Sequence, residues 1–303
     1  MADHDKKYPK WASKLYESIS TKFFEILTLI SPRLNTILQF RRRKGWKLNL
    51  DNPQTLDEKI QKLKLESYAT DPLIIQCADK FAVRKYIEEH GCSDLLIPLI
   101  AAYDKVEDVE WDKLPQAFAM KWNFGSGFNI ICPDKSKLDI ENTKKKMKEW
   151  GKNKFWLFFS EMHYKAMPKK IVVEKYLKPE HGVQPDDYKI YCFNGVPKYI
   201  LLCTGREFGR PKFYFFDEKW TLARINRDSK AAPEGFTYPR PECLEKLLES
   251  AKTLSAPFKF VRADFYVVIG KVYFGELTFT PDAGMDKWRL PETDRLFGSL
   301  LKL

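Results

Sequence analysis

Asn194 and Gly195, placed between two segments of strand character, restrict the fold of this chain more than any other feature of its sequence. The flanking residues 187–193 and 198–203 are rich in Tyr, Ile, Leu and Cys. A two-residue hairpin turn needs positive φ at both central positions, and Asn-Gly adopts this conformation readily. The pair therefore predicts a β-hairpin and, with it, antiparallel strand pairing.

Strand and helix patterns are interspersed along the rest of the chain. Apolar runs predict further strands over residues 95–98, 117–121, 128–132, 170–176, 212–216, 258–268 and 271–278. Helical spacing predicts helices over residues 79–89, 138–164 and 241–254, and a capping box formed by Thr55 and Glu58 predicts one more that begins there. The mixture predicts an α+β fold.

Composition excludes several classes of protein. With 303 residues, of which 44% are hydrophobic, the chain can build a core and is not disordered. Its six cysteines contain no C-x-x-C pair, which argues against a disulfide scaffold or a zinc module and indicates a reducing compartment. Because no signal peptide and no apolar run of ~18 residues is present, we expect a cytoplasmic protein.

The positive charge is concentrated in an N-terminal arm. The net charge is +11, and residues 1–50 hold 11 Lys and Arg against four Asp and Glu, a local excess of +7. An apolar stripe with Phe23, Phe24 and Ile30 precedes the basic run 41–44. The pattern fits a helix packed on the protein's own core with a solvated basic end, or contact of residues 17–44 with an anionic membrane or a polysaccharide-synthesis partner. No nucleic-acid module accompanies the charge, so nucleic acid is not an expected partner.

Two carboxylates lie opposite each other in the last predicted hairpin. If a three-residue turn joins the strands, Asp264 faces Glu276 and Arg262 faces Thr278. Carboxylates whose Cβ atoms are ~5 Å apart repel each other, and a divalent cation removes this repulsion. Oxygen ligands favour Mg²⁺. The structural alternative pairs Asp264 with Arg262 on a solvated face and Glu276 with Lys271.

Small residues and lysines indicate a phosphate site. The Gly-Ser-Gly sequence at 125–127 forms the tip of a predicted hairpin, where backbone N–H groups are accessible, and Lys121 ends the preceding strand. Asp187 and Lys189 share one face of another strand. An ordinary turn and a surface ion pair are the structural alternatives, and the Gly-Lys-Ser/Thr ending of a P-loop is absent.

Four segments carry a resemblance to a known family. They are Asn49 to Gln61, Ala78 to Arg84, Pro185 to Lys189 with Phe193 to Gly195, and Phe274 to Pro281. In order and spacing they resemble the ATP-grasp superfamily, and within it the TupA-like branch associated with teichuronopeptide and capsule synthesis. The resemblance covers residues 48–303.

The resemblance implies two α+β lobes with antiparallel sheets that clamp ATP, preceded by a helical N-terminal region. The expected parts are a basic amphipathic arm (1–48), a reduced region before the ATP-grasp fold (49–115), a lid lobe (116–180) and a C-terminal lobe with the metal site (181–303). The implied activity is an ADP-forming ligase that uses ATP and Mg²⁺ to join a carboxylate, such as a uronic acid of a capsule or surface polysaccharide, to an amine through an acyl phosphate. A phosphotransferase acting on a sugar hydroxyl and a glycosyltransferase of polysaccharide synthesis remain as alternatives.

The resemblance also implies roles for individual residues. Arg262 and Lys189 would face the transferring phosphoryl group as catalytic residues, and Asp264, Glu276 and Thr278 would hold Mg²⁺. Thr278 stands where most superfamily members have Asn. The residues implied for ATP binding are Lys80, Lys121, Gly125, Ser126, Gly127, Glu174, Lys175, Tyr176, Leu177 and Asp187, with the backbone of Lys175 and Leu177 at the adenine.

Overall fold

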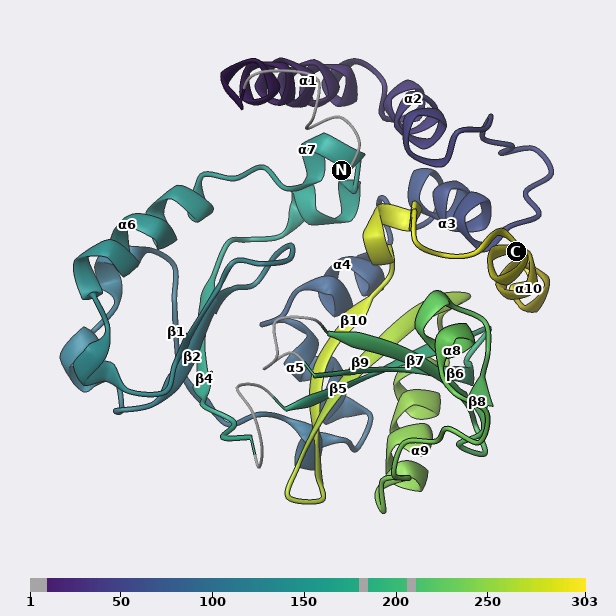
Figure 1. Cartoon of the computed structure of the whole chain (residues 1–303). Helices are drawn as coiled ribbons and strands as arrows, with labels where there is room; N and C mark the ends of the chain where they lie inside the picture. The colour runs from purple at the N-terminus through teal and green to yellow at the C-terminus, as the bar shows by residue number, and fades with distance from the viewer. Residues whose placement is uncertain (1–9, 180–184, 206–210) are drawn as a thin grey trace.

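Two antiparallel sheets organise the computed structural model, which describes residues 10–179, 185–205 and 211–303 (Figure 1). Within these residues, a four-stranded sheet has the order β1-β4-β2-β3 and a six-stranded sheet has the order β10-β9-β5-β6-β7-β8. The expected α+β fold with antiparallel sheets is confirmed. Residues 1–9 of the expected arm and the expected boundary between residues 180 and 181 lie outside the described residues.

The smaller sheet and its helices form one unit, which we call the small lobe. Its strands are β1 (Leu99–Tyr103), β2 (Phe118–Trp122), β3 (Asn129–Cys132) and β4 (Ile171–Lys175). Helix α6 (Ile140–Gly151) packs on β2, where the Trp122 indole N–H donates to the carbonyl of Met147 at 3.0 Å. Helix α7 (Trp156–Phe159) and the 3-10 helix η5 (Met162–Ala166) lead the chain back to β4.

The larger sheet carries a helix on each face, and we call this unit the large lobe. Its strands are β5 (Asp186–Phe193), β6 (Val196–Thr204), β7 (Lys212–Asp217), β8 (Leu222–Ala223), β9 (Phe260–Val268) and β10 (Lys271–Thr278). Cys192 faces Ala251 of α9 (Leu244–Ser255), whereas its neighbour Tyr191 contacts Phe297 of α10 (Pro291–Leu300). The α10 face of this sheet also carries the candidate site. Helix α8 (Arg227–Ala231) follows β8.

Local sequence signals explain several elements. Asn194 and Gly195 have φ of 49° and 75°, and Phe193 pairs with Val196 across them, so the predicted two-residue hairpin is confirmed. The capping box of Thr55 and Glu58 is formed at the start of α3 (Leu56–Leu65). Helix α9 confirms the predicted helix over 241–254.

Other elements differ from the sequence-based expectations. Residues 93–95 form a 3-10 turn and the strand β1 begins only at Leu99, so the strand predicted over 95–98 is wrong. The helix predicted over 138–164 breaks after Gly151, where a Cβ atom would lie 2.6 Å from the Trp122 ring. Helix α5 (Val83–Glu89) starts later than predicted, and α4 (Pro72–Ala78), α8, α10 and β8 had no clear signal. Further 3-10 turns cover Val106–Asp108, Trp111–Lys113, Lys135–Lys137 and Pro281–Gly284 (η7).

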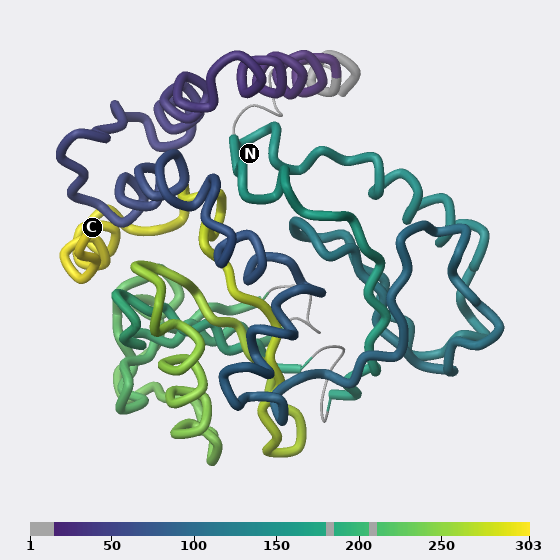
Figure 2. Tube along the Cα trace, turned by 180° about the vertical axis from the view of Figure 1, so that it is seen from behind, coloured from purple at the N-terminus to yellow at the C-terminus, as the bar shows by residue number. Residues whose placement is uncertain are grey.

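Two N-terminal helices lie across both lobes (Figures 1 and 2). Helix α1 (Lys10–Ile30) runs beside α7, and α2 (Pro32–Lys44) lies beside α3. Their inner face buries Phe24, Leu27 and Phe40. The basic end of α2 is only partly solvated, because the Lys44 ammonium is buried 2.6 Å from the carboxylate of Asp57. Among the described residues, no helix combines the length and apolar character needed to cross a membrane.

Candidate active site

The hairpin of β9 and β10 brings the expected acidic pair together. Asp264 pairs with Glu276, and Arg262 pairs with Thr278, as predicted. The three-residue turn is wrong, however, because Lys271 pairs directly with Val268 and leaves a two-residue turn. A bulge between Phe274 and Glu276 shifts the register by one residue and restores the predicted pairing.

Asp264 is held by two cations on the sheet face. Its carboxylate accepts two hydrogen bonds of 2.7 Å from the guanidinium of Arg262 and one of 2.7 Å from Lys189. Lys189 also lies 2.7 Å from Asp187. Burial raises the pKa of the Asp264 carboxyl, and the charges of Arg262 and Lys189 oppose that rise. The pairing with Arg262 foreseen by the structural alternative is therefore present, but on a buried face.

Glu276 is surrounded by positive charge. Its carboxylate lies 3.3 Å from the Lys80 ammonium and 3.8 Å from Arg262, and it accepts a hydrogen bond of 3.1 Å from the Thr278 hydroxyl. Burial raises the pKa of Glu276, but the charges of Lys80, Arg262 and Lys189 outweigh burial and lower it to about 2. Glu276 is thus ionised at neutral pH, and its partner is Lys80 in place of the Lys271 of the structural alternative.

Lys80 is anchored to the Gly-Ser-Gly loop. Its ammonium donates to the carbonyl of Gly125 at 2.6 Å, and its backbone N–H donates to the carbonyl of Asn123 at 2.9 Å. The fully buried Asn123 donates through its side-chain amide to Asp79 at 2.6 Å and accepts from the backbone N–H of Lys170 at 2.8 Å. The Lys80 turn, the loop and the start of β4 therefore form one connected unit.

The loop itself needs its glycines. Gly125 and Gly127 have φ of 65° and 81°, in the left-handed region that favours glycine. A Cβ atom on Gly125 would lie 2.8 Å from the Phe155 ring. Ser126 and Gly127 are exposed at the tip. Their position leaves the tip accessible to a ligand, while Phe124 and Phe128 anchor its base at a ring separation of 5.5 Å.

Lys121 is paired with a buried carboxylate. Its ammonium lies 2.7 Å from one oxygen of Glu174, and Arg84 lies 3.4 Å from the other. The Glu174 side chain, with 6% of its surface exposed, is therefore directed to two cations. The resemblance implies that Glu174 begins the adenine edge, which stays a prediction. The structure shows that its side chain pairs with Lys121 and Arg84.

Two adjoining cavities run between the lobes. One encloses about 160 Å³ and is lined by Lys121, Lys175, Tyr176, Leu177 and Tyr266, among others. The second encloses about 170 Å³, and its lining includes Lys80, residues 124–128, Lys189, Asp264 and Glu276. Both are lined by Lys121, Asn129 and Tyr266, so they adjoin there, and we call the two together the cleft. One end is edged by the backbone after β4 and the other holds the charged cluster.

The charged cluster offers oxygen ligands for a metal ion. Within the part of the chain that the structure describes, no group of three or more His, Cys, Asp and Glu side chains could hold a metal. Asp264, Glu276 and Thr278 supply two carboxylates and one hydroxyl. Three such donors fit Mg²⁺ only if a molecule bound in the cleft contributes further oxygen atoms to the ion.

A second set of residues lies near the site, and no pattern in the sequence predicted their contacts. Glu161, which is buried between α7 and η5, accepts a hydrogen bond of 2.6 Å from the hydroxyl of Thr280, two residues beyond Thr278. Lys64, fully buried in α3, donates to the carbonyl of Phe159 at 2.7 Å. The first contact joins the small lobe to the segment after β10 and the second joins it to α3, and each connects residues more than 90 positions apart.

Comparison with known proteins gives one family match. A family model described as TupA-like ATPgrasp matches residues 58–302. No curated protein gives a significant match.

Several solved ligases are similar at low identity. A D-alanine–D-alanine ligase from Bacillus anthracis complexed with ATP is 19% identical, with 74% of this chain and 63% of that chain covered and a TM-score of 0.45. An L-amino acid ligase from Bacillus licheniformis is 12% identical, with 75% and 49% covered and a TM-score of 0.46. The D-cycloserine synthetase DcsG is 13% identical, with 77% and 72% covered and a TM-score of 0.42. This chain thus spans less than two thirds of the length of the first two ligases.

Proposed function

Since this chain belongs to the TupA-like ATP-grasp family, we propose that it is an ADP-forming ligase that uses ATP and Mg²⁺ to join a carboxylate to an amine. One observation carries the proposal. Lys80, Lys189 and Arg262 converge on Asp264 and Glu276 at one end of a cleft between the lobes. Phosphoryl transfer is accelerated mainly by positioning and by neutralisation of charge, and this cluster is suited to both.

ATP would lie along the cleft with its base at the end of β4. Lys175, Tyr176 and Leu177 line the first cavity, and backbone groups of Lys175 and Leu177 would pair with an adenine there. The N–H of Lys175 already donates to the carbonyl of Pro98 at 2.9 Å, so its carbonyl would be the group that it contributes. Lys121 would meet the phosphates after exchanging its contact with Glu174, which lies 2.7 Å away. The exposed tip at Ser126 and Gly127 would cover the phosphates with backbone N–H groups.

Mg²⁺ would be held by Asp264, Glu276 and Thr278 together with phosphate oxygens. The ion would neutralise the charge that develops on the transferring phosphoryl group. Glu276 is the side chain best suited to bind the ion, because its pKa of about 2 keeps the carboxylate ionised and a third of its surface is exposed. Lys80 and Thr278 are the groups that would reorient around it.

The reaction proceeds in two steps. A carboxylate oxygen of the substrate attacks the γ-phosphorus, the bond to the β-phosphate oxygen breaks, and ADP leaves. The amine nitrogen then attacks the carbonyl carbon of the acyl phosphate, inorganic phosphate leaves, and the amine gives up a proton to solvent. Arg262 and Lys189 would stabilise the phosphoryl oxygens in the first step, since both reach the face on which Asp264 lies.

The acid substrate would be a uronic acid or a similar sugar carboxylate of a capsule or surface polysaccharide. Support for this class comes from the resemblance to the TupA-like branch, with which the sequence analysis associates teichuronopeptide and capsule synthesis. The proposal does not extend to the identity of the amine.

An assay of ADP release over a panel of uronic acids and amines tests the function. Hydroxylamine should trap the acyl phosphate as a hydroxamate, in amounts equal to the ADP formed. Release of ADP together with a phosphorylated sugar, and without hydroxamate or amide, would identify a phosphotransferase and overturn the ligase proposal.

The outer face of the N-terminal arm would contact an anionic membrane surface at the cytoplasmic side. Exposed apolar side chains follow one face of α1 with helical spacing, and we call this row the exposed stripe: Tyr16, Ile19, Phe23, Ile26 and Ile30. Leu34 and Leu38 continue it on α2. Lys22, Arg33 and Arg41 are exposed beside it, which gives the complementary charge for acidic lipids. Such contact would bring the enzyme to lipid-linked polysaccharide precursors.

A further inference from the structure

The inner face of the N-terminal arm makes a different set of contacts from the exposed stripe. We propose that α1 and α2 brace the two lobes against each other and thereby position the ATP site, with Thr28 and Asn35 as positioning residues. This inference rests on the proposed ATP site, and it assigns to the arm a task that does not involve a membrane.

At one end, the arm contacts residues 157–161 of the small lobe, which include the end of α7 and which we call the corner. The hydroxyl of Thr28 donates to the carbonyl of Leu157 and lies 2.8 Å from the hydroxyl of Ser160. The amide nitrogen of Asn35 lies 2.6 Å from the hydroxyl of Thr28, 3.0 Å from the carbonyl of Phe158 and 2.8 Å from the hydroxyl of Ser160, so its two hydrogens are shared among three acceptors. Thr28, Asn35 and Ser160 are almost fully buried. A buried polar cluster of this kind is costly to break, because each group loses its partner without gaining water.

The corner also contacts the segment that follows β10, next to the candidate site. Ser160 has a left-handed φ of 56°, which turns the chain so that the next residue, Glu161, reaches Thr280. Lys64 of α3 donates to the carbonyl of Phe159 at 2.7 Å. Residues 157–161 are therefore held between the arm, α3 and the segment that follows β10, the strand that carries Glu276 and Thr278.

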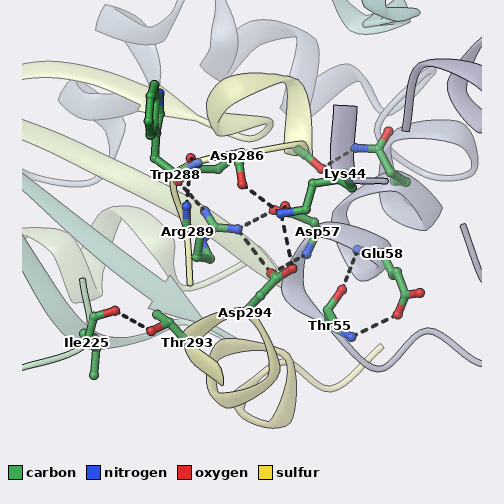
Figure 3. Close-up of polar contacts among 12 residues, drawn as sticks. Lys44, Thr55, Asp57, Glu58, Ile225, Asp286, Trp288, Arg289, Thr293 and Asp294 are labelled. Carbon is green, nitrogen blue, oxygen red and sulfur yellow. Dashed lines mark hydrogen bonds and ion pairs between the residues drawn. The ribbon is translucent and has the colours of Figure 1, made fainter. Parts of the chain in front are cut away.

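The other end of the brace is anchored in the large lobe by a buried ion cluster (Figure 3). The Lys44 ammonium at the end of α2 lies 2.6 Å from Asp57 of α3 and 3.7 Å from Asp294 of α10, and it donates to the carbonyl of Asp286 at 2.8 Å. Arg289 pairs with both Asp57 and Asp294. Asp57 and Asp294 expose no more than 1% of their side-chain surface, so their partners are the cations of the cluster and not water. Burial raises the pKa of Asp57 to about 7, although Arg289 and Lys44 lower it.

The two anchors together constrain how the lobes can move. Residues 157–161 belong to the small lobe, and they contact the arm, α3 and Thr280 beyond β10. A movement of the small lobe relative to the large lobe must therefore break these contacts or carry the arm with it. With the corner held by the arm, the sheet and the Gly-Ser-Gly loop return to the same place over Glu276. Loosening the corner lets the lobe take up more orientations, so that more order must be gained when ATP binds, and affinity falls.

Hydrogen exchange on the unaltered protein provides the first test. With Mg²⁺ and a non-hydrolysable ATP analogue, exchange should slow in residues 122–129 and also in residues 24–39 and 157–161, which do not line the cleft. Protection confined to 122–129 would overturn the brace while leaving the ATP site intact. Absence of protection everywhere would instead count against the ATP site itself.

A matched pair of substitutions provides the second test. Thr28→Val removes the hydroxyl and keeps the shape, whereas Thr28→Ser keeps the hydroxyl. Thr28→Val should raise KM for ATP about fivefold, the factor expected for one hydrogen bond, with a smaller change in kcat, and Thr28→Ser should restore the wild-type value.

A purely structural role for Thr28 predicts a different outcome. In that case Thr28→Val would lower the melting temperature while the folded fraction kept the wild-type KM for ATP, and the proposal would fail. If Thr28→Val does not fold, Gln39→Ala takes its place, because Gln39 donates to the carbonyl of Phe158 at 3.2 Å and its loss leaves the Thr28 cluster intact.

Discussion

The ammonium of Lys80 lies 3.3 Å from the carboxylate of Glu276, and this contact joins the turn before α5 to the last strand of the large sheet. The same ammonium also holds the carbonyl of Gly125. One side chain thus touches the proposed metal ligand and the proposed phosphate loop, so a ligand that binds either must rearrange both.

Replacing Glu276 with glutamine should abolish most of the activity without unfolding the protein. The substitution keeps the shape but removes the negative charge that balances Lys80 and would bind Mg²⁺. We expect turnover to fall about 100-fold or more, as when a charge-stabilising group is lost from a transition state. ADP release measures it, and Glu245→Gln on the opposite face of the sheet is the matched control. Normal turnover in Glu276→Gln would refute the assignment of Glu276.

The loop at 123–128 should become ordered when nucleotide binds. Its tip is exposed, and residues 124–128 lie beyond the last ladder pair of β2 and β3, Lys121 with Asn129. Hydrogen exchange over residues 122–129 should slow with Mg²⁺ and a non-hydrolysable ATP analogue. In Lys121→Met this protection should be lost, because the cation at the base of the loop is missing. Equal exchange with and without the analogue in the wild type would argue against a phosphate lid.

His163 should make the protein sensitive to acid. Both ring nitrogens are buried without a hydrogen-bond partner among the described residues, and burial lowers the pKa to about 3 from an ordinary 6.5. Below pH 6.5 the unfolded chain binds a proton that the folded chain does not, so the free energy of unfolding falls as the pH drops toward 3. The slope contributed is at most about 1.4 kcal/mol per pH unit.

Denaturant titrations of the wild type and of His163→Leu between pH 7 and pH 4, which brackets most of that interval, measure this effect. The variant should lose less stability on acidification. Parallel curves for the two proteins would mean that His163 does not titrate with unfolding.

The exposed stripe should bind acidic liposomes. Co-sedimentation should rise with the fraction of anionic lipid and fall with salt, because each basic residue near the surface contributes about 1 kcal/mol. The double variant Phe23→Ser with Ile26→Ser should stay in the supernatant and keep the turnover of the wild type. If the wild-type protein ignores anionic liposomes, the stripe serves another purpose.

The sequence led to the acidic pair through two errors that cancelled. The predicted turn was one residue too long, and the bulge before Glu276 shifted the register back by one residue. Gly275 was the available signal, since glycine inside a strand often marks a bulge. The alternation of side chains along a strand does not show whether a one-residue shift comes from the turn or from a bulge, because both change the register in the same way.

Contacts between residues far apart in the chain could not be predicted from the sequence. Glu174 looks like part of a strand edge until Arg84 and Lys121 are placed beside it. Likewise, nothing in the spacing of Thr28 or Asn35 points to residues 157–160, which lie over 120 positions away. Local patterns predict which segments become helix or strand, whereas the packing of the arm on α7 depends on the shape of the complete core.

The prior pairing of the site's cations with carboxylates has a consequence for selectivity. Lys80, Lys121 and Lys189 already face Glu276, Glu174 and Asp264 at 3.3 Å or less. Binding of ATP at the proposed site would then be an exchange of counter-ions, in which the incoming phosphates and Mg²⁺ would replace partners that are already present. Such an exchange changes the net charge of the cleft little, so affinity for ATP should depend only weakly on ionic strength. A lone sulfate or phosphate, which brings no cation for the displaced carboxylates, should be a poor competitor.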